Sequence, residues 1–428
     1  MNIVNNISNE LKIQSFKDKI IKEIDLTTLQ KAKELGAIQR ERKITEPLNL
    51  IWALLIYANE KISIRILSVI ATILGIGSIS DRAWSKKMLN TKEWLKYIVC
   101  KMSSKLNVRD ITLKRVIKIV DCSRIAQTGK ERNEVRVHTS FNLNEGLIDE
   151  VHLTDKHVAE SFEHYEIEQG NIIIGDRAYG KSKVIEYTAS RQADILARMS
   201  PSQIKLYDKE GKKINMYNIL KSSKEKKFEH KYYVIENKKK IAVRVICSAI
   251  PEDKMESVNK RIKTEMKKHQ TKNSKPETKE YAKWIILVTT LDSKEYSIEE
   301  VIRLYKLRWQ IELLFKRMKQ HLEAHKIPKG SYQYAEILVY LWIITWLIVE
   351  KEAIAMEKIL MKKLDDISQI SFWTLCNISY HKVKDIICGG IYANINLTDI
   401  VENYKYLLNN IRVREPQLYQ WKFSLLIA

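Results

Sequence analysis

Residues 305–319, with the sequence YKLRWQIELLFKRMK, contain four polar side chains at the spacing Y-x2-R-x3-E-x6-K. They are Tyr305, Arg308, Glu312 and Lys319. On one continuous α-helix, which turns by about 100° per residue, these side chains fall within roughly 60° of one another. The spacing therefore predicts a single helix with a phenol, a guanidinium, a carboxylate and an ammonium group along one stripe.

Apolar side chains occupy the neighbouring arc of the same helix, at Leu304, Leu307, Ile311, Leu314, Phe315 and Met318. An arc of this kind packs against a core, so the polar stripe is predicted to lie beside the protein interior. One acid between two bases and a phenol suits a carboxylate that holds a metal ion while its neighbours hold phosphates.

The composition is strongly basic, with 74 Lys and Arg against 52 Asp and Glu and a formal charge of +22 over 428 residues. This length favours two or more domains, and this charge favours a nucleic-acid partner. The alternative is a protein that is merely rich in lysine because it comes from an AT-rich genome.

Other classes of protein are disfavoured. The five cysteines are scattered and form no C-x-x-C pair, which indicates reduced thiols in a cytosolic protein rather than zinc ligands or disulfides. The polar N-terminus does not resemble a signal peptide. The longest apolar run, residues 337–349, is too short to cross a membrane and predicts a buried helix.

The pattern along the chain changes from helical to mixed. Residues 1–105 predict helices at 26–35, 48–57, 62–74 and 79–88, and the last two have the outline of a helix-turn-helix or of an ordinary helical hairpin. Residues 106–200 alternate between strands and helices, with a hairpin around Asn144-Glu145-Gly146 and helices at 157–167 and 183–192.

The next segment, residues 201–292, predicts hairpin-like strands at 216–220, 231–237 and 240–250 and a further strand at 284–291. Its charged stretch 255–275 is either a solvated helix or a surface that follows phosphates. Ser297 and Glu300 form a capping box for the helix with the polar stripe, and the chain after residue 350 is again helical with a Trp/Tyr-containing tail.

Two aspartates are predicted to stand where strands end: Asp121 after VIKIV and Asp176 after NIIIG. Sites in open α/β sheets collect at strand ends, although either acid alone could equally be a turn or cap residue. With Glu312 they form a candidate triad of carboxylates. Such a triad suits Mg²⁺, and two ions about 4 Å apart support in-line displacement at phosphorus.

These motifs resemble those of DDE transposases of the insertion-sequence-four type, which are identified by a YREK signature. Tyr305, Arg308, Glu312 and Lys319 match that signature at every position. The segment IVDCSRIAQTGK resembles the one with the first catalytic aspartate, and IIIGDRAYGKS the one with the second. The resemblance covers residues 115–200 and 280–330.

The resemblance implies an α/β fold, in which an RNase H-like catalytic domain with a mainly β insertion is flanked by helical N- and C-terminal regions. The implied divisions are a DNA-binding domain (1–105), the first part of the catalytic core (106–200), the insertion (201–292), the second part of the core (293–345) and a C-terminal region suited to dimerisation (346–428).

The implied reaction is cut-and-paste transposition in the bacterial cytoplasm, without contact with a membrane. A water molecule cleaves one strand at the element's end, the freed 3′-hydroxyl forms a hairpin, and the reopened end joins target DNA. Asp121, Asp176 and Glu312 would hold two Mg²⁺ ions, for which Mn²⁺ could substitute. The partners would be double-stranded terminal repeats, target DNA and a second copy of the chain in the synaptic complex.

The resemblance also implies DNA contacts. Tyr305, Arg308 and Lys319 would grip phosphates near the hairpin and near an extruded base. Trp284, which lies 21 residues before Tyr305 (305 − 284), would stack on that base, unless it is a core aromatic residue. Arg198 would contact DNA, unless it is an ordinary surface arginine.

Two alternatives to the transposase remain. A DNA-binding derivative without catalysis would share the basic charge, but the presence of all three acids counts against it. A structure-selective nuclease on the same scaffold would need the acids without the YREK side chains, and it would cut DNA without joining it.

Overall fold

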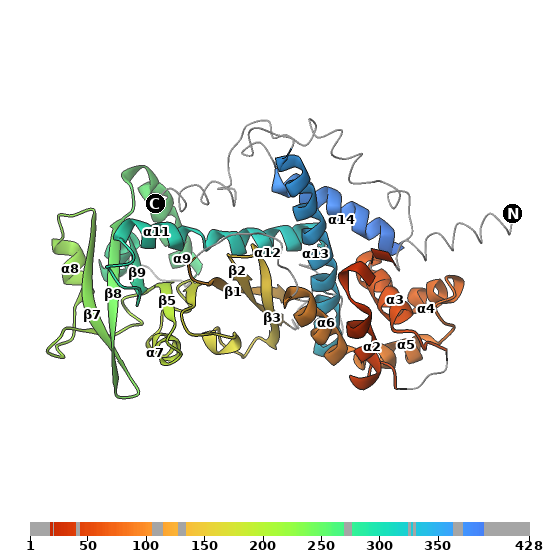
Figure 1. The fold of residues 1–428 in the computed structure, drawn as a ribbon. Coiled ribbons are helices and arrows are strands. Elements are labelled where there is room, and N and C mark those ends of the chain that lie inside the picture. The colour runs from red at the N-terminus through yellow and green to blue at the C-terminus, as the bar shows by residue number, and fades with distance from the viewer. Residues whose placement is uncertain are drawn as a thin grey trace.

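The computed structural model describes residues 18–19, 21–39, 43–104, 114–126, 134–268, 276–323, 327, 331–362 and 371–388. These residues form an elongated molecule, with a long sheet at one end and a group of helices at the other (Figure 1). The Trp/Tyr-containing tail after residue 388 and the end of the charged stretch, residues 269–275, lie outside the described part.

The N-terminal region is helical, as predicted. Its helices are α2 (Leu26–Glu34), α3 (Pro47–Glu60), α4 (Ile64–Ile73), α5 (Asp81–Leu89) and α6 (Lys92–Ser104). Serines begin the two helices of the predicted hairpin: the Ser63 hydroxyl accepts a hydrogen bond from the Ile66 N–H, and the Ser80 hydroxyl accepts one from the Ala83 N–H.

The described strands form one sheet. They are β1 (Ile117–Ala126), β2 (Glu134–Asn142), β3 (Leu147–Asp155), β4 (Ile172–Gly175), β5 (Asp194–Arg198), β6 (Leu206–Tyr207), β7 (Lys227–Glu236), β8 (Lys239–Ala249) and β9 (Trp284–Thr289). Their order is β3-β2-β1-β4-β5-β9-β8-β7-β6. Strands β1, β4 and β5 run parallel, and the other pairs are antiparallel.

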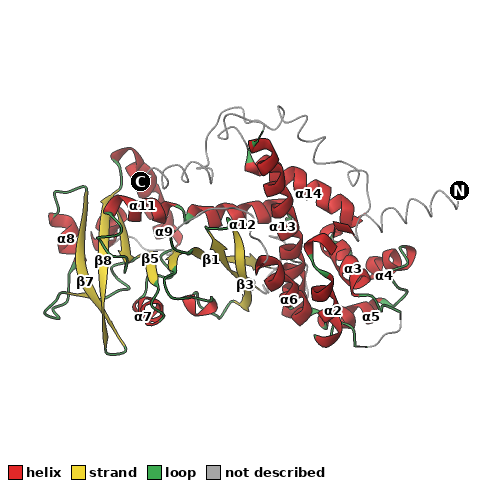
Figure 2. Cartoon of the chain, in the orientation of Figure 1, coloured by secondary structure: helices red, strands yellow, loops and turns green. Residues whose placement is uncertain are grey.

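The strands of the predicted insertion continue the same sheet. Strand β9 pairs with β5 in the register Leu196↔Thr289, and β8 pairs with the other edge of β9 (Figure 2). The α/β class with flanking helical regions is therefore confirmed, and the arrangement agrees with an RNase H-like fold. The division into five segments stays a prediction.

Two predicted elements are wrong. Residues 157–167 form only a 3₁₀ turn, η1 (Phe162–His164), between extended residues, and this path buries Phe162, Tyr165 and Ile167 in the core. Residues 216–220 belong to a helix, α8 (Met216–Ser222), rather than a strand. Asn215 caps this helix, which buries Met216 and Leu220 one turn apart.

The predicted continuous helix over the YREK residues is also wrong. The chain forms α11 (Ile298–Lys306), which begins with the predicted Ser297–Glu300 capping box, and α12 (Trp309–His321). Between them the N–H groups of Leu307 and Arg308 donate to carbonyls three residues earlier, as in a 3₁₀ turn. Side chains three residues apart eclipse in such a turn, so Tyr305 and Arg308 remain on one side.

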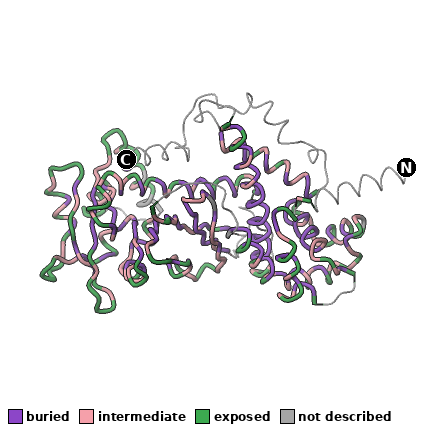
Figure 3. The backbone as a smooth tube through the Cα atoms, viewed as in Figure 1, coloured by how far each residue is buried: buried purple, intermediate pink, exposed green. Residues whose placement is uncertain are grey.

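Helices cover both faces of the sheet. Ile119, Ile174 and Leu196 face the core that includes α12 and α13 (Tyr332–Met361), whereas Ile173 and Ile195 face the core that includes α7 (Ser182–Ser190). Helix α13 is buried along most of its length between α3, α6 and α14 (Phe372–Cys388), which confirms the buried helix predicted at 337–349 (Figure 3). Among the described residues, no helix combines the length and apolar character that crossing a bilayer requires.

A basic helix and a short helix with two glutamates and one lysine complete the insertion. Helix α9 (Met255–Lys268) confirms the predicted charged helix over the part that the structure describes, and it follows the 3₁₀ turn η2 (Glu252–Lys254). Helix α10 (Pro276–Ala282) leads directly into β9. Helix α10 also contacts α8, α9 and β9.

Candidate active site

The register of the parallel strands places three candidate residues at one level. Ile119 pairs with Ile174, and Ile174 pairs with Leu196. Two positions further along each chain stand Asp121, Asp176 and Arg198. Because side chains alternate between the faces of a sheet, Asp121 and Arg198 point to the face covered by α12.

Asp121 lies inside a strand and not at its end, which corrects the prediction. Strand β1 continues to Ala126, and β2 pairs with it through the register Asp121↔Thr139. The parallel pairing with β4 stops at Ile119. Asp121 is therefore still beyond the last parallel pair.

The surroundings of Asp121 favour its protonated form. Burial raises the pKa of Asp121 to about 7, although the Cys122 N–H, which donates to the carboxylate Oδ1 at 2.8 Å, opposes the shift. The nearby charge of Asp176 raises the pKa further. The charge of Arg308 lowers the pKa of Asp121, and a bound cation would favour the ionised form of both acids in the same way.

A tight turn holds Asp176. Its Oδ1 accepts a hydrogen bond from the Ala178 N–H at 2.7 Å. The segment after it passes so close to β5 that a Cβ on Gly180 would lie 2.3 Å from the Arg198 carbonyl oxygen. Glycine at position 180 is therefore required by backbone contact between the Asp176 turn and β5.

Helix α12 provides the opposite wall. Arg308 and Glu312 form an ion pair, with Nη1 and Oε1 2.6 Å apart, and the Arg308 guanidinium lies 5.8 Å from the centre of the Tyr305 ring. The Lys319 ammonium donates to the Arg124 carbonyl at 3.0 Å, so the last turns of α12 reach β1. All four YREK side chains therefore lie on the side of α11 and α12 that faces the aspartates.

The charges on the two walls act on one another. Burial would lower the pKa of Arg308, but Tyr305, Glu312 and Asp121 raise it above the ordinary value. Burial lowers the pKa of Lys319, against the opposing charge of Asp121. The charge of Asp121 on the sheet therefore acts on both Arg308 and Lys319 on the helix side.

Tyr305 connects the remaining members of this group. Burial raises the pKa of the Tyr305 phenol, while the charges of Arg308 and Arg198 lower it and Asp176 raises it. Arg198 and Asp176 are therefore both within electrostatic reach of the phenol. The structure thus brings together the candidates on the sheet and those on the helix, with Trp284 as the exception.

Trp284 lies apart from the carboxylates, in the wall of a small pocket. Its side chain is 7% exposed, its ring packs edge-on against Phe228 at 5.6 Å between centroids, and its Nε1 donates to Glu280 at 3.2 Å. The pocket has a volume of about 140 Å³, and Arg177 and Arg198 line it. Trp284 is thus largely a core residue with one edge at a cationic pocket.

The carboxylates fit a hard divalent cation but are not gathered around one point. Among the described residues, no three His, Cys, Asp or Glu side chains form a ready ligand set. Glu312 is turned toward Arg308, whereas the charge of Asp176 acts on Asp121. The donors are all oxygen atoms, as Mg²⁺ and Mn²⁺ prefer, and a bound cation would oppose the effect of burial, which raises the pKa of Asp121.

Two neighbouring residues were not predicted from the sequence. Trp309, the first residue of α12, is 43% exposed and lies one turn before Glu312. Burial raises the pKa of Glu160, and Asp176 raises it further, so Glu160 is a fourth acid near the site. A helical projection of residues 305–319 places Trp309 at the edge of the polar stripe. No local pattern marks Glu160, because its segment resembled a helix.

Comparison with known proteins gives the family. Residues 114–348 match the family model described as the transposase DDE domain. This chain belongs to the DDE transposases. The match covers more than half of the chain and contains Asp121, Asp176 and Glu312, so the resemblance stated from the sequence is confirmed at the level of the family.

Individual transposases extend the similarity. The transposase for insertion sequence element IS421 from Escherichia coli is 28% identical over 304 residues, which are 68% of this chain and 82% of that protein. The InsL protein of element IS186A from Escherichia coli K12 has the same identity over 303 residues. A protein of element IS4SA from Synechocystis is 41% identical over 69 residues, 15% of this chain and 20% of that protein.

This DDE transposase is therefore an enzyme that cleaves and transfers DNA, and it belongs to the transposases of insertion sequences. Such domains use divalent metal ions in general. The roles of the individual site residues stay predictions. Residues 1–113, which include α2 to α6, lie outside the family match.

The raised pKa of Asp121 gives a prediction about stability without metal. The folded pKa, about 7, is above the unfolded value, so ionising Asp121 costs folding free energy. The cost is complete above pH 7 and disappears as the pH falls below about 4. We expect Asp121→Asn to stabilise the metal-free transposase by a few kcal/mol at pH 8 and by little at pH 4.

Thermal unfolding in EDTA at both pH values measures this difference. An exposed acid, Glu210, is a suitable control, and Glu210→Gln should change the melting temperature equally little at both pH values. Equal stability of Asp121→Asn and the wild type at pH 8 would contradict the raised pKa that burial gives Asp121.

Proposed function

We propose that this transposase catalyses cut-and-paste transposition, with strand nicking, hairpin formation and strand transfer at the ends of its insertion sequence. The observation that carries the proposal is the meeting of the Asp121–Asp176 pair on the sheet with Glu312 and the basic YREK side chains on α12. The family supports the cleavage chemistry, and the YREK side chains support the hairpin step.

Each wall of the site would have its own task. Asp121, Asp176 and Glu312 would hold two Mg²⁺ ions, with Mn²⁺ as a substitute, and these supply positive charge to the attacking and leaving oxygens when bound. On the helix side, Arg308 has a planar fork of donors that matches a phosphate, while Lys319 presents a point charge beside β1. These basic groups would orient the scissile phosphodiester against the acids.

An extruded base would stack on Trp309. Trp309 presents an exposed ring next to Glu312, and such rings stack on unpaired bases with a gain of about 1–3 kcal/mol per base. Arg198 and Trp284 would contribute the pocket of about 140 Å³, whose arginines suit the phosphate or base edge of the extruded nucleotide. Stacking offsets the cost of unpairing that nucleotide.

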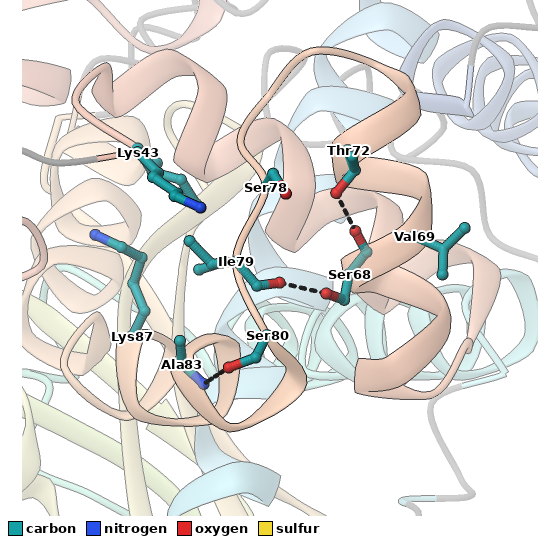
Figure 4. Close-up of a pocket in the computed structure, with 10 residues that line it drawn as sticks. Lys43, Ser68, Val69, Thr72, Ser78, Ile79, Ser80, Ala83 and Lys87 are labelled. Carbon is teal, nitrogen blue, oxygen red and sulfur yellow. Dashed lines mark hydrogen bonds between the residues drawn. The ribbon is translucent and has the colours of Figure 1, made fainter.

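The N-terminal helices would bind the double-stranded ends of the element. A hollow of about 840 Å³ lies between α4 and α5, with Lys43 and Lys87 on the side opposite Ser68 and Thr72 (Figure 4). Burial lowers the pKa of Lys87, and in the described part of the chain neither lysine forms an ion pair. Two ammonium groups without acidic partners suit a phosphate backbone.

We expect the double variant Lys43→Gln/Lys87→Gln to bind terminal-repeat DNA on the order of tenfold more weakly at low salt, because two phosphate contacts are lost. The slope of log affinity against log salt should fall by about two. Fluorescence anisotropy over a salt series measures both. Lys96 on α6 is exposed, so Lys96→Gln serves as a single-charge control. Equal slopes for all three proteins would exclude the hollow from DNA binding.

The decisive test of the proposed function uses DNA with the ends that flank this gene. Purified transposase is incubated with labelled ends in Mg²⁺ or in EDTA, beside Asp121→Asn. Nicks and hairpins that need Mg²⁺ and are absent in the variant support cut-and-paste transposition. Binding without cleavage in Mg²⁺ or Mn²⁺ would favour a silent DNA-binding derivative, and cleavage without joining would favour a structure-selective nuclease.

We further propose a homodimer in the synaptic complex, because two ends of one element must be brought together. The transposase would work in the bacterial cytoplasm, where its DNA substrate is. Sedimentation of the protein with and without end DNA tests the dimer, and a complex with one chain on two ends would contradict it.

A further inference from the structure

The positive charge of Arg308 stands between acids that the proposed function needs together. Its Nη1 lies 2.6 Å from Glu312 Oε1, and its charge also acts on Asp121. The guanidinium therefore pairs with one predicted metal ligand, Glu312, and its charge favours the ionised form of a second, Asp121. In this arrangement Glu312 is directed toward Arg308, while Asp121 and Asp176 remain a separate pair.

The backbone holds Arg308 in this position. Its N–H donates to the Tyr305 carbonyl at 3.1 Å in the 3₁₀ turn between α11 and α12, and it forms the N-cap of α12. From there Glu312 is four residues ahead on the same face, which is the ordinary spacing of an intrahelical ion pair. The turn itself thus directs the guanidinium at Glu312.

Two features separate this pair from an ordinary surface pair. The side chain of Arg308 is only 18% exposed, and its Nε is buried and has no hydrogen-bond partner among the described residues. Leaving a buried donor unpaired is unfavourable, and a guanidinium that binds a phosphate through two donors would remove that defect. The Nη1 donor of Arg308 is therefore paired with Glu312, whereas its Nε donor is left for a further ligand.

We propose that the Arg308–Glu312 ion pair keeps the carboxylates apart until a DNA phosphate takes the guanidinium, so that binding of DNA and of divalent cations is coupled. This inference rests on the proposed function. The phosphate pairs with Arg308 and satisfies the unpaired donor. Glu312 is then released toward Asp121 and Asp176, and three acids without a positive charge among them need a cation.

The coupling is reciprocal, since a cation that draws Glu312 to the aspartates also frees Arg308 for phosphate. Coupling between two sites typically changes an affinity by about 5- to 150-fold. We therefore expect bound DNA to tighten cation binding by at least about tenfold. Without DNA, replacement of Arg308 should give the same tightening.

The experiment measures Mn²⁺ affinity by the electron paramagnetic resonance signal of free Mn²⁺. The full-length transposase is titrated alone and with a duplex that ends at the element's terminus, so that no bond remains to be cut, and binding to the duplex alone is subtracted. Wild type should bind Mn²⁺ at least about tenfold more tightly with the duplex. Arg308→Gln should bind Mn²⁺ without the duplex as tightly as wild type does with it.

Arg303 provides a matched control, because it is exposed on α11 and Arg303→Gln removes the same charge one turn or so away. Like the wild type, Arg303→Gln should bind Mn²⁺ more tightly with the duplex than without it. If Arg308→Gln does not fold, Arg308→Lys keeps the charge but lacks the fork of donors, and its Mn²⁺ affinity without DNA should rise severalfold. Equal Mn²⁺ affinity of wild type with and without DNA, or an unchanged affinity in the Arg308 variants, would overturn the inference.

Asp121→Asn separates this inference from the proposed function. If Asp121→Asn loses Mn²⁺ binding while the wild type binds Mn²⁺ equally tightly with and without the duplex, the role of the ion pair is rejected and the metal site remains. Unchanged Mn²⁺ binding in Asp121→Asn would instead reject the metal site itself, and with it the proposed chemistry.

Discussion

Glu312→Gln is expected to reduce DNA cleavage by about a thousandfold or more, because one of three carboxylates that hold the metal ions loses its charge. Metal ions contribute several kcal/mol to the transition state of phosphoryl transfer, and each 1.36 kcal/mol is a factor of ten in rate. DNA binding should change little, because the basic side chains that contact phosphates remain. The variant also releases Arg308 from its ion pair, which favours rather than weakens phosphate contact.

Cleavage of labelled ends measures the cleavage rate, and fluorescence anisotropy of the uncleaved complex measures the DNA affinity. Glu210→Gln, an exposed change of the same kind in the insertion, should leave both at wild-type values. A thermal unfolding curve for Glu312→Gln confirms that the protein is folded. If binding is lost together with cleavage, Glu312 has a structural role; if cleavage falls less than about tenfold, it is not a metal ligand.

Lys319→Ala is expected to slow hairpin formation about a hundredfold while slowing the first nick much less. Removing one donor aimed at a developing charge costs about 10²–10³ in rate. The Lys319 ammonium lies at the Arg124 carbonyl on β1, where it would meet the second strand as the end folds back. The nick involves the first strand only, so it depends less on this contact.

A time course on one labelled end resolves the nicked and hairpin products. Lys316 lies one turn earlier on α12 and is exposed, with its ammonium over the Trp373 ring instead of toward β1. Lys316→Ala is therefore the matched control and should affect neither step. Equal slowing of nick and hairpin in Lys319→Ala would show that Lys319 supports the whole site and not the hairpin step.

Much of the fold follows from patterns that act locally. The helices of residues 26–104, the hairpin of β2 and β3, and the strands β4, β5 and β9 all have the expected period and turn residues. The capping box at Ser297 needs only two side chains three residues apart. Prediction fails where burial overrides the pattern, as at residues 157–167, where aromatic residues enter the core from extended backbone.

The candidate site divides in the same way. Tyr305, Arg308, Glu312 and Lys319 are recognisable by spacing alone, and the break between α11 and α12 leaves them on one side. The sequence left the role of Trp284 open, because a side chain on a strand can point into a core or into a pocket. The sheet places most of the Trp284 ring in the core. Trp309 could have been found from its place at the edge of the polar stripe, whereas Glu160 has no local signal, since its nearness to Asp176 depends on the whole fold.

Local sequence is sufficient for the identity of the acids, most of the helices and strands, and the YREK motif, because these depend on residue types and on periods of two to four residues. The continuous sheet from β3 to β6, the level of Asp121 beside Asp176, and the Arg308–Glu312 ion pair depend on contacts between distant segments. Such contacts are selected by burial and charge pairing over the whole chain, and no short window contains them.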